Sequence, residues 1–528
     1  MKKLFDRLNE NIDSYTLNDQ IELKKIASSI NRRRKRKQPI DRLLAAFEAR
    51  LDQADRRGLK NIAENLKFTY PDNLPISVRV DEIKSVLSEN QVIIVCGSTG
   101  SGKTTQLPKI ALDCGLGRSG RIGCTQPRRL AATAMAKRVA QELNVGCGDE
   151  VGFQVRFNKH CRDNTVIKFM TDGILLSETQ HDPDLRQYDC LIIDEAHERS
   201  LNIDFILGYL KRLKEKRPEL KIIISSATLD AENFSKFFHD APILTIEGRT
   251  FPVEDFFLPP EQDEDLSQHI ARAVNWISEV DRRGDILVFL PGEREIRDAK
   301  DMLEGRNIAN TRIIPLFGRL SNKEQQAVFS PGKQRRIILS TNVAETSITI
   351  PNIHYVIDSG LVRLSRYNPR NHIQSLQIEQ VSQASARQRR GRCGRIADGI
   401  CVYLYDEETL SESPEFTDPE ICRTSLAGVI LQMTILKLGR IDDFPFLDPP
   451  QSALVREGYQ TLEDIQAVSP DGAITSDGLH IARIPLDPHI AKMLVTAYKR
   501  EVLPEVIIIA AYLSMQDPCE RPLDKQAE

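Results

Sequence analysis

A glycine-rich octapeptide, residues 97–104, constrains the fold of this chain more than any other stretch. It reads Gly-Ser-Thr-Gly-Ser-Gly-Lys-Thr, which is the spacing of a phosphate-binding loop. Residues 92–95 before it are continuously apolar, as in a buried parallel strand, and residues 105–112 have helical character that Pro108 should distort in the first turns. A strand, a glycine loop and a helix in this order favour a nucleoside triphosphate site over a chance glycine-rich turn.

Composition limits the class of protein. The chain has 528 residues, 41% hydrophobic and 28% charged, which is typical of a soluble globular protein of three or four domains. No apolar run is long enough to predict a membrane span, and the N-terminus does not resemble a secretory signal, so we expect a cytoplasmic protein. Ten cysteines without a CxxC pair predict neither zinc nor disulfides, and Cys96 and Cys190 should be small core residues.

Charge is distributed unevenly along the chain. The net charge is −3, but residues 1–60 carry 16 Lys/Arg against 9 Asp/Glu, which predicts a basic arm before an acidic body. The arm contains the uninterrupted basic run 32–37, followed by an apolar helical face at Leu43, Leu44, Phe47 and Leu51. Two interpretations of the run remain open: a solvated, disordered link, or a segment that contacts phosphates.

Strands and helices alternate from the glycine loop to about residue 247, as in a parallel α/β sheet, and polar residues follow several strands. After the apolar residues 190–193 come Asp194 and Glu195. The first carboxylate is expected to hold Mg²⁺ through water, and the second to accept a proton from an attacking water. Such a pair alone would most often cap a helix, but the upstream phosphate loop favours a site of NTP hydrolysis.

A second α/β unit is expected over about residues 249–408, with its clearest strands at 285–290 and 336–339. It has no second phosphate loop, but residues 388–395 read Gln-Arg-Arg-Gly-Arg-Cys-Gly-Arg. A basic surface turn is the plain alternative, whereas in this context the arginines are expected to reach across a cleft to phosphates.

Residues 361–379 alternate around a turn at 368–371 and predict a hairpin, which could be a simple edge hairpin. A helix should start at 419–421 and end at Gly439, and residues 469–472 predict a second hairpin turn.

These motifs together resemble those of the DEAH-box RNA helicases of superfamily 2, and among them the bacterial HrpA-type enzymes. The similarity extends from about residue 80 to residue 528. The motifs are, in order, the phosphate loop, Thr-Gln-Pro-Arg-Arg at 125–129, Thr-Asp-Gly at 171–173, Asp-Glu-Ala-His at 194–197, Ser-Ala-Thr at 226–228, Leu-Val-Phe-Leu-Pro-Gly at 287–292, Thr-Asn-Val-Ala-Glu-Thr-Ser at 341–347, and the arginine-rich motif at 388–395.

The resemblance implies an α/β fold of two tandem RecA-like P-loop NTPase lobes, followed by a winged-helix domain and the beginning of a helical ratchet domain. The expected divisions are a basic helical extension at 1–77, the first lobe at 78–248, the second lobe at 249–408, the winged helix at 409–475 and the ratchet at 476–528. Relatives continue into further ratchet helices and an OB-fold, so we expect a truncated chain.

The resemblance also implies roles for individual residues. Catalytic roles are expected for Glu195, Gln388, Arg392 and Arg395. Nucleotide contacts are expected for Gly97, Ser98, Thr99, Gly100, Ser101, Gly102, Lys103, Thr104, Arg138, Phe329, Asp358 and Arg389, with Arg138 and Phe329 sandwiching the base and Asp358 near the ribose. Coupling of hydrolysis to lobe movement is expected for His197, Ser226 and Thr228. RNA-backbone contacts are expected for Thr125, Arg128, Arg129, Thr171, Thr341 and Thr346. Mg²⁺ ligation, partly through water, is expected for Thr104 and Asp194.

The function so implied is an ATP-dependent RNA helicase or translocase that moves 3′ to 5′. ATP or another NTP would be the substrate, Mg²⁺ the cofactor, and single-stranded 3′ segments of RNA the partner, with a ribosome or other ribonucleoprotein as a further target and no membrane. Two rivals stay open: a DNA helicase of the same fold, since no residue identifiably reads a 2′-hydroxyl, and a binding protein that uses ATP as a clamp. A kinase or GTPase is disfavoured because neither explains the arginines of the second lobe.

Overall fold

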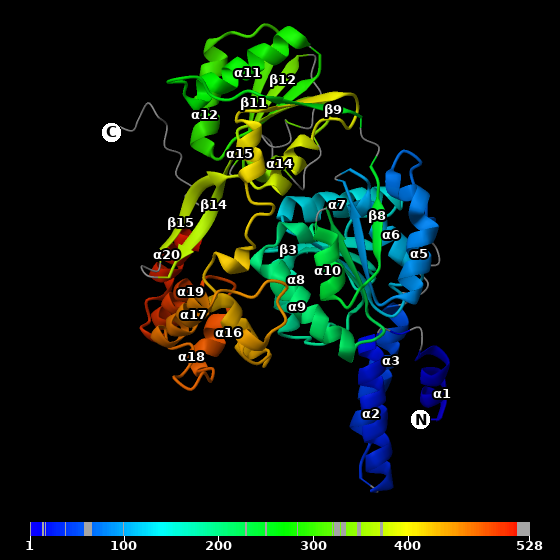
Figure 1. Ribbon diagram of the computed structural model, residues 1–528. Helices are drawn as coiled ribbons and strands as arrows, with labels where there is room; N and C mark the ends of the chain where they lie inside the picture. The colour runs from blue at the N-terminus through cyan, green and yellow to red at the C-terminus, as the bar shows by residue number, and fades with distance from the viewer. Residues whose placement is uncertain are drawn as a thin grey trace. The chain divides into compact units, whose positions relative to one another are not determined.

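The computed structural model describes residues 2–12, 15, 17–36, 38–57, 66–98, 100–227, 230–248, 251–281, 283–318, 320, 328, 334–345, 350–369 and 373–514 (Figure 1). Contacts divide the chain into two units. The first contains Met1–Leu316, Gln326–Val362 and Gln380–Thr417, and the second contains Phe317–Gln325, Arg363–Glu379 and Asp418–Glu528.

The first unit begins with three helices, α1 (Lys2–Asn11), α2 (Leu17–Lys35) and α3 (Asp41–Arg57). Helices α2 and α3 pack side by side as a hairpin (Figure 1). They share with α1 a small apolar core of Leu8, Tyr15, Leu23, Ala27, Ile30, Phe47, Leu51 and Ala54. The predicted apolar face of α3 is confirmed. The alternative of a disordered link is wrong for residues 32–36, because α2 continues through Lys35 and a turn follows it.

The first sheet has eight strands in the order β4-β3-β5-β2-β6-β7-β1-β8, and every pairing except β3 with β4 is parallel. The strands are β1 (Val92–Gly97), β2 (Arg121–Gln126), β3 (Val151–Val155), β4 (Asn158–His160), β5 (Ile167–Thr171), β6 (Tyr188–Ile193), β7 (Lys221–Ser226) and β8 (Ile243–Ile246). All six residues of β1 are buried, as its unbroken apolar sequence predicts.

Helices cover this sheet and position the strand ends. The turn η2 (Pro75–Arg79) and helices α5 (Val80–Glu89), α6 (Lys103–Asp113) and α7 (Arg129–Glu142) share one apolar core with the strands. Helix α6 continues across Pro108, which is buried. The remaining helices are α8 (Asp172–Thr179), η3 (Ala196–Glu198), α9 (Leu201–Lys216) and α10 (Ala231–Phe237). Because parallel strands end at the same edge, the residues after β1, β2, β5, β6 and β7 converge there.

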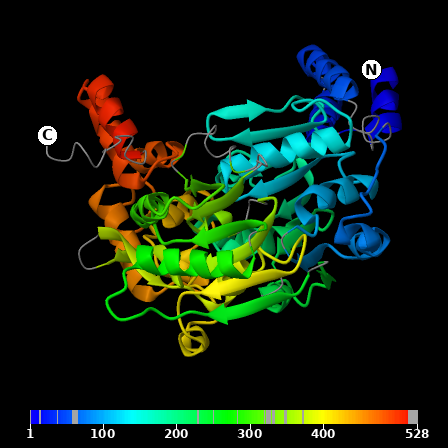
Figure 2. The same ribbon diagram turned by 90° about the horizontal axis from the view of Figure 1, so that it is seen from above.

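The second sheet has six parallel strands in the order β11-β12-β10-β13-β16-β9. They are β9 (Val253–Phe257), β10 (Asp285–Phe289), β11 (Thr311–Leu316), β12 (Arg335–Ser340), β13 (Ile353–Asp358) and β16 (Gly399–Tyr403). Helices α11 (Leu266–Val280) and α12 (Glu293–Gly305) lie next to each other on this sheet (Figure 2). The unit also includes η5 (Asn342–Ala344), α14 (Gln383–Arg390) and α15 (Glu407–Glu412). The two α/β lobes confirm the predicted RecA-like architecture.

The second unit combines a hairpin with helices. Strands β14 (Leu361–Asn368) and β15 (Ile373–Gln380) form the predicted hairpin. The helices are η6 (Glu420–Cys422), α16 (Ala427–Ile435), η7 (Ile441–Asp443), α17 (Ser452–Asp464), α18 (Ser476–Arg483), α19 (Pro488–Lys499) and α20 (Leu503–Ser514). The turn at 469–472 is confirmed by the Ser469 amide, which donates to the Ala473 carbonyl at 2.8 Å. No helix among the described residues is long and apolar enough to cross a membrane.

The predicted single helix from 419 to Gly439 is wrong. A short η6 turn is followed by a break, and α16 begins only at Ala427. At the break Arg423 has φ −137° and ψ 4°, outside the helical region. Its carbonyl accepts from the Tyr367 amide at 2.9 Å, and its guanidinium donates to the Ser365 carbonyl at 2.9 Å. The bond from the Tyr367 amide occupies the Arg423 carbonyl that a continuous helix would have used, and the guanidinium bond holds Arg423 against the hairpin.

Candidate active site

The glycine loop connects β1 to α6 in the first lobe. Gly100 and Gly102 have φ values of 90° and 93°, which residues with a side chain rarely adopt. Gly102 is also the N-cap of α6. A side chain at Gly97 would place its Cβ 2.6 Å from the Ile246 carbonyl oxygen. The loop therefore needs these glycines, and the N-terminus of α6 faces whatever the loop encloses. Thr99 lies outside the described residues.

Lys103 is held inside this loop. Its ammonium donates to the carbonyl oxygens of Gly97 at 2.5 Å and Ser98 at 3.1 Å, and to Ser101 Oγ at 3.4 Å. Burial lowers the pKa of Lys103, whereas the carboxylates of Glu195 and Asp194 act to raise it. The cation thus lies within the phosphate-binding loop, where the charges of the acidic pair reach it, and its contact with phosphates stays a prediction.

A cavity of about 440 Å³ opens beside the loop, within the size range of small-molecule sites. Seven of the predicted site residues line it: Gly97, Gly100, Gly102, Lys103, Thr104, Arg138 and Glu195. Six other residues line it as well: Leu74, Thr105, Gln126, Met135, Glu142 and Ala227. These seven predicted residues thus meet at one hollow, whereas the lining does not include Ser98, Ser101, Asp358, Gln388, Arg389, Arg392 or Arg395.

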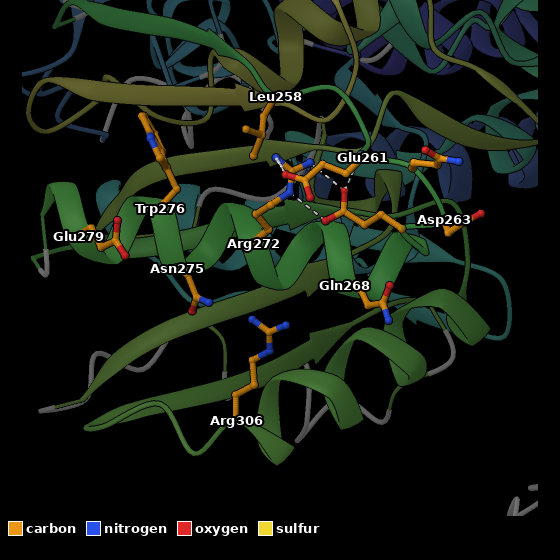
Figure 3. A pocket seen from close by; sticks show the side chains of 11 residues that line it. Leu258, Glu261, Asp263, Gln268, Arg272, Asn275, Trp276, Glu279 and Arg306 are labelled. Atoms are coloured by element: carbon orange, nitrogen blue, oxygen red, sulfur yellow. Dashed lines mark hydrogen bonds and ion pairs between the residues drawn. The ribbon is translucent and has the colours of Figure 1, made fainter.

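A larger hollow of about 680 Å³ lies on the second lobe, but none of the predicted site residues lines it (Figure 3). Its walls come from the end of β9 and from α11, with Arg306 opposite. Arg272 donates to both carboxylate oxygens of Glu264, at 2.8 and 2.7 Å, and to the Pro259 carbonyl at 2.8 Å (Figure 3). Arg272 and Glu264 therefore neutralise each other, and we assign no reaction to this surface.

Asp194 and Glu195 follow β6, as predicted. The Asp194 side chain is 2% exposed; its Oδ2 accepts from Gln126 Nε2 at 2.6 Å and its Oδ1 accepts from the Glu195 amide at 3.0 Å. Glu195 has φ 51°, an uncommon backbone conformation for a residue other than glycine. Burial, with the Asp194 and Glu198 carboxylates, raises the pKa of Glu195 to about 8, while Lys103 and Arg392 favour its ionised form. A carboxyl group tuned in this way matches the requirement for a general base near neutral pH.

His197 connects the acidic pair to the end of β7. Its Nδ1 accepts from the Ala227 amide at 3.2 Å, and its Nε2 lies 3.5 Å from Glu195 Oε2. Burial lowers the pKa of His197 to about 4, so the ring is neutral, with its proton on Nε2 towards Glu195. Ser226 is buried at the end of β7 and Thr228 lies outside the described residues. Of the described coupling residues, His197 thus contacts the residue that directly follows Ser226.

Two arginines of the second lobe lie near Glu195. Arg392 is 4% exposed and donates to the Glu345 carbonyl; burial and Arg395 lower its pKa to about 9, while Glu195 acts to raise it. Burial lowers the pKa of Arg395 to about 10, and a Cβ at Gly100 would lie 3.8 Å from its Nη1. Both guanidiniums therefore interact with Glu195 from the opposite lobe, and Arg395 also lies near the glycine loop. Gln388 is half-buried on α14.

Arg389 and Asp358 form a buried ion pair in the second lobe. Arg389 Nη1 donates to Asp358 Oδ1 at 2.6 Å, and Arg389 Nε donates to Glu345 Oε2 at 3.1 Å. Burial acts to lower the pKa of Arg389, but Asp358 and Glu345 raise it overall. Asp358 is completely buried and also accepts from the Gly360 amide and the Tyr405 hydroxyl. Its expected contact with a ribose stays a prediction, which these partners and this burial disfavour.

The base-binding prediction rests on one described residue. Arg138 lines the cavity with a side chain that is 59% exposed, and its Nε donates to Glu142 Oε1 at 2.8 Å. Glu142 in turn pairs with the buried Lys109 at 3.0 Å. Phe329 lies outside the described residues, so the expected sandwich stays a prediction.

The residues expected to contact RNA are in different environments. Thr125 is completely buried beside Asp172, which disfavours direct contact. Arg128 Nη1 donates to the Val343 carbonyl of the other lobe at 2.8 Å. Arg129 is exposed, Thr171 and Thr341 are partly exposed, and Thr346 lies outside the described residues.

Sequence reasoning missed three residues of the site. Gln126 fixes Asp194, Glu345 lies between Arg389 and Arg392, and Glu142 joins Arg138 to Lys109. Gln126 and Glu345 were within motifs that the sequence displayed, but the motifs did not say what these side chains bond. The position of Glu142 on α7, four residues after Arg138, was the available signal.

Comparison with known proteins gives the family. The profile of the DEAD/DEAH box helicases matches residues 78–237, that of the helicase conserved C-terminal domain residues 264–397, and that of the ratchet-like helicase associated domain (HA2) residues 487–528. The chain is 49% identical over 538 aligned residues to the ATP-dependent RNA helicase HrpA of Escherichia coli (strain K12), covering 99% of this chain and 41% of that protein. It is 51% identical over 494 aligned residues to the HrpA homolog of Haemophilus influenzae (strain ATCC 51907 / DSM 11121 / KW20 / Rd), covering 91% and 38%.

Solved structures agree with this placement. A crystal structure of the Escherichia coli DEAH/RHA helicase HrpB superimposes with a TM-score of 0.79 at 32% identity, covering 85% of this chain and 57% of that one. The chain spans about two fifths of the length of the curated relatives named above. With the two-lobed fold and the site geometry described above, these matches identify the chain as a member of the DEAD/DEAH box helicases, similar to the HrpA-type enzymes.

Proposed function

We propose that this chain hydrolyses ATP, and other nucleoside triphosphates, in the cavity beside its glycine loop, and uses that hydrolysis to act on RNA. One observation carries the proposal. The glycine loop and Glu195 line one cavity of the first lobe, and the buried Arg392 and Arg395 of the second lobe lie close enough to Glu195 to interact with its charge. A site that only binds a nucleotide would need the loop, but it would not need a buried carboxyl group or two buried guanidiniums. These additional groups favour hydrolysis.

Mg²⁺ fits the oxygen donors of this site. The Thr104 hydroxyl is at the start of α6 beside the cavity, and the Asp194 carboxylate is fixed in orientation by Gln126. Among the described residues there is no cluster of three or more side chains suited to hold a metal. A magnesium ion here would take most of its ligands from water and phosphate oxygens, which is its usual manner at nucleotide sites. When bound, the ion would neutralise charge on the phosphates.

The chain's own residues account for the chemistry. The loop amides and Lys103 would bind the phosphates, and the ionised Glu195 would take a proton from the attacking water. Arg392 and Arg395 would stabilise negative charge that develops on the transferred phosphoryl group. Since these groups come from both lobes, hydrolysis depends on lobe closure, and the reverse change accompanies product release.

RNA as the polymer is supported by the relatives, which are named ATP-dependent RNA helicases. We extend this to 3′-to-5′ movement on single-stranded segments and to remodelling of ribonucleoprotein, in the cytoplasm. Exposed Arg129 and half-exposed Thr171 and Thr341 supply backbone contacts that do not depend on base sequence. We further assign the domains as predicted from the sequence, with a winged helix at 409–475 and the ratchet from 476.

Two substitutions test the hydrolysis site. Glu195→Gln removes the base but keeps the phosphate-binding loop, so ATP binding should persist while turnover falls at least about a hundredfold. Lys103→Ala should weaken ATP binding itself. The control is Glu232→Gln, which makes the same chemical change at an exposed carboxylate on α10. Turnover by Glu195→Gln near the wild-type rate would show that another group is the base.

The rival functions make different predictions. A DNA helicase would be stimulated more by single-stranded DNA than by RNA of the same sequence. An ATP-dependent clamp would bind RNA more tightly with ATP but would not separate a duplex. Measuring ATP turnover and strand separation with both polymers distinguishes the three functions.

A further inference from the structure

The tip of the α2–α3 hairpin carries a concentrated positive charge. Arg32, Arg33, Arg34, Lys35 and Arg36 are all exposed and follow one another without interruption at the C-terminal end of α2. Successive helical residues are 100° apart, so these side chains surround the helix end and do not line one face. We refer to these five residues as the basic tip.

Several other charges of α1, α2 and α3 are paired with one another. Asp19, which is completely buried, pairs with Arg50 at 2.9 Å, and Asp52 pairs with Arg7 at 2.8 Å. Arg7 also pairs with Asp55, which accepts from the Tyr15 hydroxyl at 2.5 Å. By contrast, within the part of the chain that the structure describes, no carboxylate is at ion-pair distance from any residue of the basic tip.

This arrangement disfavours the helix unless an anion is present. Arg32 and Arg36 are four residues apart and Arg32 and Lys35 three apart, spacings at which like charges destabilise a helix by a few tenths of a kcal/mol per pair. The negative end of the helix dipole offsets part of that repulsion. A polyanion would remove the rest.

We propose that the basic tip is a second RNA-binding site, which contacts the phosphate backbone of double-stranded RNA independently of nucleotide. The proposal rests on the proposed function only in taking RNA as the polyanion. A ring of cations at a rigid helix end can reach phosphates of both strands across a groove, whereas a duplex offers such a protein little base information.

Two other ligands fit the hairpin less well. Single-stranded RNA is usually held by aromatic side chains that stack on bases, but Phe5 and Phe47 stack on each other at 5.2 Å within the hairpin core. A membrane surface would require apolar side chains beside the cations, and the large apolar side chains that α2 and α3 contribute to the hairpin core are buried in it or packed against it. The basic tip thus offers positive charge, but no apolar surface for a membrane and no aromatic surface for unpaired bases.

The test is binding of a blunt RNA duplex of mixed sequence, without nucleotide, to the whole chain. Changing all five residues of the basic tip to Gln keeps helix propensity while removing charge. Affinity near 0.1 M salt should fall by about tenfold or more, and the slope of log affinity against log salt should become shallower by about 2 to 4. The melting temperature should not fall, because the substitutions remove repulsion within the helix, and ATP turnover without RNA should match that of the wild-type chain.

A matched pair of variants checks that position, and not total charge, is responsible. Arg33→Gln with Arg34→Gln should weaken duplex binding severalfold. Lys24→Gln with Lys25→Gln removes the same charge from exposed positions about two and a half turns earlier on α2 and should change duplex binding less than twofold. Equal effects of the two pairs would contradict the proposal.

Three further results for the five-residue variant would overturn the assignment. The first is an unchanged salt slope, and the second is a loss of affinity for single-stranded RNA equal to that for the duplex. The third is a loss of binding to anionic vesicles or acidic proteins with no loss of binding to the duplex. The Lys103→Ala chain separates this question from hydrolysis. It should retain duplex binding while ATP turnover is lost, so failure of the hydrolysis assignment would leave this test intact.

Discussion

Gln126 Nε2 donates a hydrogen bond to Asp194 Oδ2 at 2.6 Å, between two side chains that are each 2% exposed. The bond joins the ends of β2 and β6, which are neighbours in the first sheet. Gln126 lies two residues before Arg128, which is expected to contact RNA, and Asp194 is expected to hold Mg²⁺. A movement of residues 125–129 on RNA binding would therefore act directly on the orientation of the Asp194 carboxylate.

We expect Gln126→Ala to leave Asp194 without its fixed partner and to lower ATP turnover about tenfold or more. The Mg²⁺ concentration for half-maximal turnover should rise, which a loss of folded protein would not cause. Gln141→Ala, on the exposed side of α7, is the matched control and should change neither quantity. A normal Mg²⁺ requirement in Gln126→Ala would mean that Asp194 is oriented by other contacts.

Asp172 should make stability depend on pH. Burial, with the Glu198 carboxylate, raises its pKa to about 7, so the folded protein holds this proton more tightly than the unfolded chain. The stabilisation is complete below the ordinary pKa near 4 and is lost as pH rises through about 7. Asp172→Asn has no such proton to lose. Its melting temperature, relative to wild type, should be higher at pH 8 than at pH 5; an equal difference at both would contradict the shifted pKa.

Local sequence patterns predicted which residues form the site, but not which of them bond to each other. The glycine loop, the acidic pair and the strand ends were visible because each depends on a few consecutive residues. The bonds from Gln126 to Asp194 and from Arg389 to Glu345 link residues 68 and 44 positions apart, and no periodicity reports such pairs. The helix expected from 419 failed for the same reason, because Arg423 bonds to the distant hairpin.

The β14–β15 hairpin also shows which contacts the sequence could not predict. Its alternation was sufficient to predict two strands, and β14 and β15 confirm them. The grouping of residues 363–379 with 418–528 could not be predicted, because it depends on contacts such as the bond from the Tyr367 hydroxyl to Glu457. Likewise, the basic run alone could not distinguish a disordered link from a helix end. That distinction required the packing of α2 against α3.

Arg389→Ala should strongly destabilise the second lobe. The substitution would leave Asp358 and Glu345 with an uncompensated buried charge, at a cost of about 3 to 5 kcal/mol. Arg390→Ala is a matched control next to it, since its pair with Asp255 is partly exposed on both sides and should cost less than about 1 kcal/mol. Urea unfolding of the two variants measures the difference. Similar losses would mean that the buried carboxyl groups find other partners.

Nucleotide selectivity should be weak. The polar side chains that line the cavity beyond the loop are already engaged, Gln126 with Asp194 and Glu142 with Arg138 and Lys109. Stacking by Arg138 accepts any base, because every base has a π-face. Turnover of ATP, GTP, CTP and UTP should therefore be comparable. A strong preference for ATP in a competition assay would require a base-reading group that the described lining lacks.

His197 should couple hydrolysis to RNA without being needed for hydrolysis itself. Its ring joins Glu195 to the Ala227 amide, and Ala227 follows the end of β7 directly. With a pKa of about 4 the ring stays neutral between pH 6 and 9, so this link should not vary with pH in that range. His197→Ala removes both contacts but leaves the loop, Asp194 and Glu195 in place. We expect basal ATP turnover within about tenfold of wild type, while stimulation by RNA falls to a small fraction of its normal value.

The exposed His181 provides the control, and His181→Ala should retain full stimulation. Basal and RNA-saturated turnover, measured in parallel, give the ratio that decides the matter. Full stimulation in His197→Ala would assign the coupling to Ser226 and Thr228, or to Arg128 through its bond to the Val343 carbonyl.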